Sequence, residues 1–318
     1  GYGDKGFEEL FGKENIHSIE YDNFFNAARE RLKNEGGIVS SFITNNLKGV
    51  KLPNIIPKLA ELESSFGDDK FFNTHALDVL FYLTILGEQV RGSVMEDITN
   101  VFKKYSLETE VEYHFLSHSL GTSVMHDCLT KLFTLDTGST LGRLKVGHPK
   151  INTYWTFANV SRLVTTFSGL SGPFETVVKP GSKGVTSMFY NIYNEFDPIA
   201  FDIFRRFDPD NSNNWIPENV FKYQYEKIIT KDVTQKDTHA IDGYLEDPKV
   251  TYPFLRALIN DFNPSEDQKN EADGKFQSIQ TEFEQIKNFK LKHAKIVDLV
   301  TFIKILKAFN KYITEDLQ

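Results

Sequence analysis

Ser119 is the first residue whose type and surroundings could support chemistry. It lies in Ser117-His118-Ser119-Leu120-Gly121, with a small residue two positions away on either side. A hydroxyl is a poor nucleophile at neutral pH, so a hydrolytic serine needs a base that accepts its proton and backbone donors close by. Small flanking residues permit the tight, strained turn that presents such a serine at a cleft. The spacing therefore predicts a nucleophilic serine, and a buried turn serine is the alternative.

The residues around Ser119 indicate a strand, a sharp turn and a helix. Residues 111–116 form a strand-like run that leads directly into the serine. Residues 121–133 return to helical spacing, and their predicted inner face holds Val124, Cys128, Leu129 and Leu132. In this context the motif is more specific than its five residues alone. His118 is expected to point away from the cleft and to be structural.

The stretch from His114 to Thr122 resembles the Gly-His-Ser-Leu-Gly turn of the α/β-hydrolase fold family, and in particular its lipase and esterase-like members. Ser117 stands where glycine is more common in that family. Residues 194–199 are similar to the strand end that presents the acid of the family's triad. Residues 238–245 are similar to the loop that carries the base, in which a histidine is followed by a short helix with an aromatic residue. The resemblance covers most of residues 1–260.

The resemblance implies a catalytic triad of Ser119, Asp197 and His239, in the family's chain order of nucleophile, acid and histidine. In these roles Ser119 attacks an acyl carbonyl, and His239 takes and later returns its proton. Asp197 holds the imidazole in the correct tautomer and stabilises the imidazolium.

Both partners of the serine have alternatives in the sequence. Asp197 precedes Pro198, and Asp-Pro is also a common turn dipeptide. The competing acids are Glu195, Asp202 and Asp208. His239 has the alternative of an ordinary loop histidine, and the competing bases are His126 and His148. Chain order disfavours His148.

An oxyanion hole needs two backbone N–H groups, one of them from the residue after the nucleophile. Leu120 is predicted to supply the first. No His-Gly loop with an apolar strand precedes Ser119, but residues 1–6, Gly-Tyr-Gly-Asp-Lys-Gly, resemble the tail of a His-Gly-x-Gly oxyanion loop. We therefore expect Tyr2 to supply the second donor, with a first core strand and a histidine upstream of Gly1 in the natural protein.

Further strand and helix patterns would place these residues at one edge of a sheet. Residues 160–167 and 187–193 are buried-strand candidates, and the second ends shortly before Asp197. Residues 16–21 are strand-like, and residues 76–105 have helical spacing with a break at Gly87. Strands separated by helices predict a mostly parallel central sheet with helices on both faces. Ligands bind at the carboxyl ends of such strands.

These patterns predict an α/β-hydrolase domain over residues 1–262 and a C-terminal helical hairpin extension over residues 263–318. Residues 38–75 contain Pro53 and Pro57 and fit no sheet element, so we interpret them as an insertion. The apolar residues of this insertion either pack in the core or form a lid over Ser119 that lines an acyl-binding cleft.

Composition excludes several classes of protein. The formal net charge of -8 and a pI near 5.6 argue against a nucleic-acid partner. No apolar run approaches the roughly 20 residues of a transmembrane segment, and the N-terminus shows no signal peptide. A single cysteine, Cys128, cannot form an internal disulfide, which favours a cytoplasmic location. Residues 208–214 are oxygen-rich but lack the glycine and glutamate of a calcium loop, so a solvated loop is favoured there. The chemistry predicted for Ser119 implies no metal or organic cofactor.

The sequence therefore predicts a serine hydrolase that cleaves a carboxylic ester, with an acyl or lipid ester as substrate, through an acyl-enzyme intermediate. The same residues would serve a thioesterase, an amidase or an acyltransferase. The competing hypothesis is a non-catalytic scaffold of the same fold, whose C-terminal helices hold a protein partner.

Overall fold

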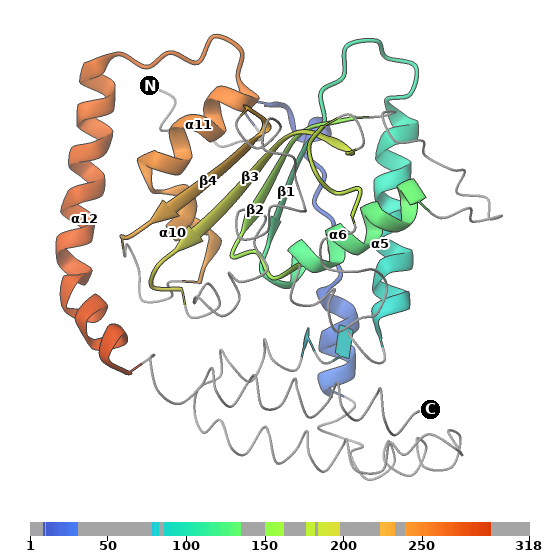
Figure 1. Ribbon diagram of the computed structural model, residues 1–318, viewed down its shortest axis with the longest axis horizontal. Coiled ribbons are helices and arrows are strands. Elements are labelled where there is room, and N and C mark those ends of the chain that lie inside the picture. The colour runs from blue at the N-terminus through green and yellow to red at the C-terminus, as the bar shows by residue number, and fades with distance from the viewer. Residues whose placement is uncertain are drawn as a thin grey trace. The chain divides into compact units, whose positions relative to one another are not determined.

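Four parallel strands form a sheet in the part of the chain that the structure describes. They are β1 (His114–His118), β2 (Ile151–Phe157), β3 (Thr186–Asn194) and β4 (Tyr225–Thr230), and they lie side by side in that order (Figure 1). The other elements include η2 (Lys13–Asn15), α5 (Gly87–Lys104), α6 (Leu120–Thr134), α10 (Ile241–Leu245), α11 (Pro248–Leu258) and α12 (Glu266–His293). A parallel sheet with intervening helices confirms the predicted α/β class.

The structure, a computed structural model, describes residues 9, 11–30, 78–79, 81–82, 86–134, 150–161, 176–181, 184–197, 223–232 and 239–293. The predicted insertion at 38–75 lies outside these residues. By its internal contacts the chain divides into two units, one made of Gly1–Glu20 and Arg91–Lys290 and the other of Tyr21–Val90 and Leu291–Gln318. The sheet and the candidate site belong to the first unit.

The second strand of the sheet lies earlier in the chain than predicted. β2 spans Ile151–Phe157, where no strand was predicted. In the predicted strand over residues 160–167, residues 160 and 161 are not in a strand, and residues 162–167 lie outside the described residues. Threonine and asparagine interrupt the apolar residues of β2, so the sequence pattern does not indicate a strand there. The structure buries most of them: Thr156 is 1% exposed, and its hydroxyl donates to the carbonyl of Tyr190 at 3.0 Å. By contrast β3 lies where a strand was predicted, over residues 187–193.

The predicted strand over residues 16–21 is absent: these residues have no strand conformation in the structure. Ile16 is 40% exposed, so the alternation of apolar and polar residues here buries no face. A strand pattern forms a strand only where a partner strand and a buried face are available.

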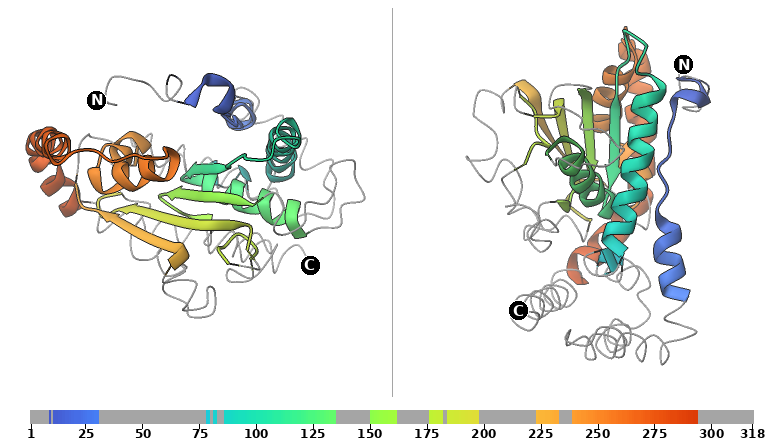
Figure 2. Two further views of the ribbon diagram at one scale, coloured as in Figure 1. Left: turned by 90° about the horizontal axis from the view of Figure 1, so that it is seen from above. Right: turned by 90° about the vertical axis from the view of Figure 1, so that its right-hand side faces the viewer.

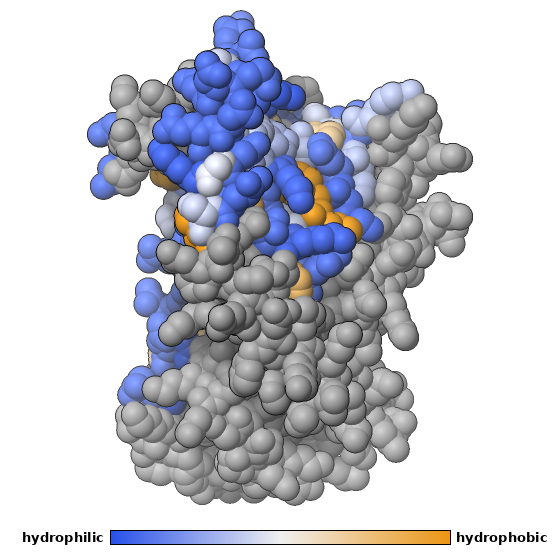
Figure 3. Space-filling model, turned by 90° about the vertical axis from the view of Figure 1, so that its left-hand side faces the viewer, coloured by the Kyte–Doolittle hydropathy of each residue, from blue (hydrophilic) through white to orange (hydrophobic). Residues whose placement is uncertain are grey.

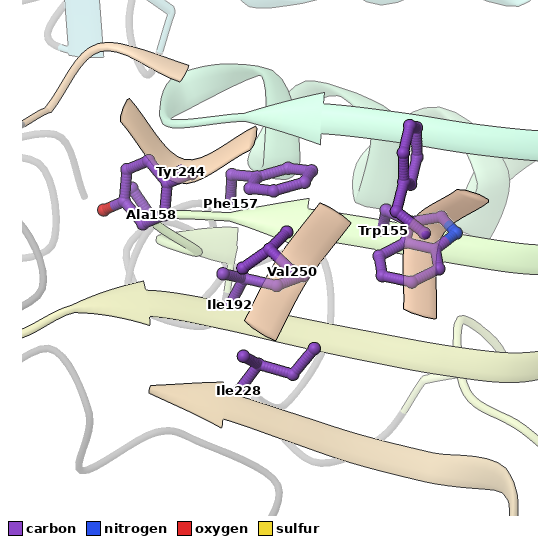
Figure 4. Close-up of a cluster of buried hydrophobic side chains, with 8 residues drawn as sticks. Trp155, Phe157, Ala158, Ile192, Ile228, Tyr244 and Val250 are labelled. Carbon is purple, nitrogen blue, oxygen red and sulfur yellow. The ribbon is translucent and has the colours of Figure 1, made fainter. Parts of the chain in front are cut away.

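One face of the sheet packs against α10 and α11. Figure 4 shows the cluster, in which side chains of β2, β3 and β4 meet Tyr244, Val250 and Phe254 of the two helices. The cluster consists of Trp155, Phe157, Ala158, Ile192, Ile228, Tyr244, Val250 and Phe254. Burial of a large apolar side chain such as Phe157, Ile192 or Ile228 stabilises the fold by about 1.5–3 kcal/mol. This core fixes α10 against the carboxyl end of β2.

The opposite face of the sheet is covered by α5 and α6. Phe115 of β1 pairs in register with Tyr154, which alternates with Trp155 and so lies on the other face. The ring of Phe102, on α5, stacks on Phe115 with centroids 6.1 Å apart. The views in Figure 2 place α6 and α11 on opposite sides of the sheet. Helices therefore cover both faces, as predicted.

The long helix α12 is polar over its described side chains. Ion pairs join Lys269 to Glu266 at 2.6 Å and Lys275 to Glu271 at 2.8 Å. Phe276 is buried, and Tyr252 of α11 donates its hydroxyl to the carbonyl of Lys269 at 3.2 Å. Figure 3 views the molecule from the left-hand side of Figure 1, where α12 lies, and the described surface there is mainly hydrophilic. Among the described residues no helix is both long enough and apolar enough to span a bilayer.

Asp247 caps α11, the helix that closes the core. Its side chain accepts the backbone N–H of Lys249 at 2.9 Å, and Pro248 occupies the first turn of the helix. Only 1% of Asp247 is exposed, and this burial raises the pKa of its carboxyl above the ordinary value of 3.8. The folded protein therefore holds this proton more tightly than the unfolded chain. The protonated Asp247 therefore adds to the free energy of unfolding at pH below 3.8. This contribution is lost as the pH rises through the raised pKa.

Two variants separate the cap of Asp247 from its charge. Asp247→Ala should lower the free energy of unfolding by about 1 kcal/mol through loss of the cap. Asp247→Asn keeps an acceptor but does not titrate, so its stability relative to the wild type should increase as the pH is raised above 3.8. Urea unfolding of the three proteins across this pH range measures both effects. A constant difference between Asp247→Asn and the wild type would contradict the assignment of the titration to Asp247.

Candidate active site

Ser119 occupies a strained turn between β1 and α6. Its φ is 52°, in the left-handed region that non-glycine residues rarely adopt. The backbone N–H of Ser119 donates to the carbonyl of Phe157 at 2.9 Å, which ties the turn to β2. Its carbonyl accepts the N–H of Thr122 at 2.9 Å and the hydroxyl of Thr122 at 2.7 Å. Such strain persists where several contacts hold the conformation, and it often marks a functional residue.

Ser117 occupies the position at which the related motif usually has glycine. It is buried, and its hydroxyl shares a hydrogen bond with the hydroxyl of Tyr154 at 2.9 Å. A buried hydroxyl without a partner would be destabilising, whereas this one is satisfied by the neighbouring strand. The departure from glycine is therefore compatible with the tight turn.

Asp197 and His239 form a buried hydrogen-bonded pair. Asp197 follows β3 and is 0% exposed, and His239 is 2% exposed. The Nδ1 atom of His239 lies 2.7 Å from Oδ2 of Asp197. An ionised carboxylate only accepts hydrogen bonds, so Nδ1 carries the proton in this contact. Nε2, on the opposite side of the ring, is then the atom that can accept a proton from a nucleophile when the histidine is neutral.

A turn after β3 sets the position of Asp197. The backbone N–H of Asp197 donates to the carbonyl of Asn194 at 3.1 Å, and the side chain of Asn194 accepts the N–H of Phe196 at 2.8 Å. The amide of Asn194 also donates to the carbonyl of Asp232 at 2.7 Å. These bonds join the turn to the segment that follows β4, so the acid is held by two strand ends.

His118 and Tyr244 are two further residues of the site. Nε2 of His118 lies 2.7 Å from the carbonyl oxygen of His239, and the two imidazole centroids are 4.5 Å apart. The hydroxyl of Tyr244 donates to Oδ2 of Asp197. We expected His118 to point away from the cleft and to be structural; its ring lies against the predicted base, His239. An aromatic residue after His239 was visible in the sequence, but its contact with the acid was not.

The described contacts bring Ser119, Asp197 and His239 to one region. In a parallel sheet the carboxyl ends of all strands lie at the same edge, and Ser119 and Asp197 follow β1 and β3 at that edge (Figure 1). His118, the residue before Ser119, contacts His239, and His239 contacts Asp197. A serine near a histidine–carboxylate pair has the parts of a nucleophile that a general base activates.

Leu120, predicted as an oxyanion donor, is the first residue of α6. The first N–H groups of a helix have no acceptor within the helix, so they are available to an anion at its N-terminus. Tyr2, the other predicted donor, lies outside the described residues. The same is true of the predicted alternatives Asp202, Asp208 and His148 and of residues 208–214.

The described alternatives for acid and base are engaged in other contacts. The side chain of Glu195 is 38% exposed and pairs with Lys231 at 3.2 Å. His126 lies on α6, where Nε2 is 2.8 Å from the hydroxyl of Thr176. Of the acids and bases considered, Asp197 and His239 are the described residues that bind each other. Across the described residues there is no cluster of three or more histidine, cysteine or acidic side chains that could hold a metal ion.

No protein-family model matches the chain, and no curated protein or solved structure matches it. A function for this site is therefore supported by its geometry and by the resemblance of its short motifs.

The strain at Ser119 can be measured without any substrate. Ser119→Ala and Ser119→Gly both remove the hydroxyl, but only glycine adopts a φ of 52° without steric cost. We expect Ser119→Gly to be more stable than Ser119→Ala by about 0.5–1 kcal/mol in urea unfolding. Ser123, inside α6, is the matched control: there the alanine variant should be the more stable, by about 1 kcal/mol. Equal stabilities at position 119 would refute a strained turn.

Proposed function

We propose that this chain is a serine hydrolase of the α/β-hydrolase fold that cleaves a carboxylic ester, with an acyl or lipid ester as its substrate class. The observation that carries the proposal is the buried Asp197–His239 hydrogen bond, with its histidine against the residue that precedes the strained Ser119. The order of strand, nucleophile turn and helix, followed by an acid after a later strand and a histidine in a later loop, supports this fold.

The proposed reaction begins at the hydroxyl of Ser119. Its oxygen attacks the acyl carbonyl carbon while Nε2 of His239 takes the proton, and the carbonyl π electrons move to the oxygen. The resulting oxyanion is bound by the N–H of Leu120 and by a second donor, for which Tyr2 is our candidate. As the tetrahedral intermediate collapses, the ester C–O bond breaks and the alcohol leaves with the proton from His239. An acyl group remains on Ser119.

Water completes the cycle through the same groups. His239 takes a proton from water, the hydroxide attacks the acyl carbon, and the proton returns to the oxygen of Ser119 as the acid product leaves. Asp197 stays ionised throughout and stabilises the imidazolium through Nδ1. The bond between Nδ1 and Oδ2 supports this role, because it leaves Nε2 as the basic atom of the neutral ring.

Reaction with a fluorophosphonate probe tests the nucleophile. We expect covalent labelling of the wild type and complete loss of labelling in Ser119→Ala, because the probe reacts only with an activated serine. Ser278→Ala removes an exposed serine of α12 and should leave the labelling unchanged. An intact, folded wild-type protein that does not react would instead favour the non-catalytic scaffold.

Turnover of short-chain acyl esters tests the base and the acid. His239→Ala and Asp197→Asn should each lower kcat by about 10⁴-fold. The first variant removes the proton acceptor, and in the second the asparagine side chain holds His239 in the wrong tautomer. His17→Ala removes an exposed histidine that contacts Tyr105, and it should leave kcat unchanged. Near-normal turnover by His239→Ala would mean that another residue is the base.

A further inference from the structure

We propose that Tyr244 is a positioning residue for the acid of the site: its hydroxyl fixes the orientation of the Asp197 carboxylate and shares the charge on the oxygen that binds His239. The observation is that one atom, Oδ2 of Asp197, receives both Nδ1 of His239 and the hydroxyl of Tyr244. This role in catalysis depends on the proposed hydrolase function, whereas its effect on the Asp197–His239 pair does not.

The burial of Asp197 gives the second donor its importance. The residue is 0% exposed, so water cannot solvate its charge. A buried charge is tolerated when hydrogen bonds replace its solvation, and bonds to charged groups are stronger than those between neutral groups. His239 changes its charge during the proposed reaction, but Tyr244 remains a neutral donor. The phenol therefore stabilises the carboxylate in every step.

The ring of Tyr244 is held firmly enough to orient this hydroxyl. Tyr244 is 1% exposed on α10, and its ring meets the ring of Phe157 edge-on with centroids 5.8 Å apart. Figure 4 shows the hydroxyl of Tyr244 directed away from the labelled apolar side chains. A tyrosine has few rotatable bonds, so packing of its ring determines where its hydroxyl lies. The core thus controls the position of Oδ2.

The same segment of chain carries both the base and this support. His239 and Tyr244 are separated by four residues, and His118 contacts the backbone carbonyl of His239 at 2.7 Å. The carboxylate is consequently bonded twice to residues 239–244, once through each side chain. The acid, the base and the tyrosine are expected to move as a unit rather than independently.

An ordinary core tyrosine would use its hydroxyl only to satisfy the nearest buried acceptor. In that case Tyr244→Phe would lower stability and leave the chemistry of His239 unchanged. A positioning role predicts more, because without the phenol a larger share of the charge on Oδ2 acts on the imidazole. The imidazolium is then favoured, and the carboxylate with one donor fewer is also easier to protonate. Both effects move the acidic limb of the pH–rate profile to higher pH.

Tyr244→Phe tests the proposal, with Tyr252→Phe as the matched control. Tyr252 also directs its hydroxyl to a carboxylate, that of Asp273 at 3.3 Å, but this pair does not include a residue of the site. We expect Tyr244→Phe to lower kcat by about 10-fold or more with little change in KM, and to shift the acidic limb to higher pH. Tyr252→Phe should change neither kcat nor the pH profile. An unchanged kcat and profile in Tyr244→Phe would overturn the catalytic role.

The nitrogen chemical shift of His239 Nδ1 provides a readout that does not depend on activity. It is measured in full-length protein with isotopically labelled histidine and assigned by its loss in His239→Ala. Phenylalanine keeps the aromatic ring, so a change of this shift in Tyr244→Phe and not in Tyr252→Phe reports the missing hydroxyl. If the wild type proves inactive but the shift changes, the hydrolase proposal fails and the positioning of the pair by Tyr244 holds. If the shift does not change, the role of Tyr244 is refuted.

Discussion

The buried carboxylate of Asp197 is the physical constraint that governs the rest of the site. Burying an ionised carboxyl group costs several kcal/mol unless hydrogen bonds compensate. Asp197 is 0% exposed, and its Oδ2 accepts hydrogen bonds from His239 and Tyr244, both in residues 239–244. The need to satisfy this charge therefore brings a segment that is distant in sequence to the end of β3. It also sets the tautomer of His239, from which the proposed chemistry follows.

The sheet and the cores on its two faces fix the carboxyl ends of the four strands relative to one another, and so position this carboxylate and its partners. Ser119 is bonded to Phe157 at the end of β2, and Asp197 follows a turn that is bonded to Asp232 after β4. The packing of α10 and α11 on one face orients Tyr244, while α5 and α6 cover the other face. The apolar cores and the polar site are thus parts of one arrangement, in which side-chain packing determines hydrogen-bond geometry.

Features that depend on neighbours in the chain were largely predictable. Small residues around Ser119 indicated a sharp turn before a helix, and α6 begins directly after the serine. A strand was also predicted over residues 187–193, shortly before Asp197, and β3 lies there. β2 was not predicted, because threonines and an asparagine interrupt its apolar residues. Their burial depends on partners in other strands, such as the carbonyl of Tyr190 that accepts from Thr156.

The sequence by itself determined the turn at Ser119 and the α/β class, since steric limits and side-chain periodicity act over a few residues. Its resemblance to short motifs of the α/β-hydrolase family gave the candidates Asp197 and His239. Tertiary structure alone decided which acid meets which histidine, placed His118 against the base and directed the hydroxyl of Tyr244 to Oδ2. These contacts join residues 42 to 121 positions apart. Their formation depends on strand register and on the packing of helices against the sheet, which local residue patterns do not encode.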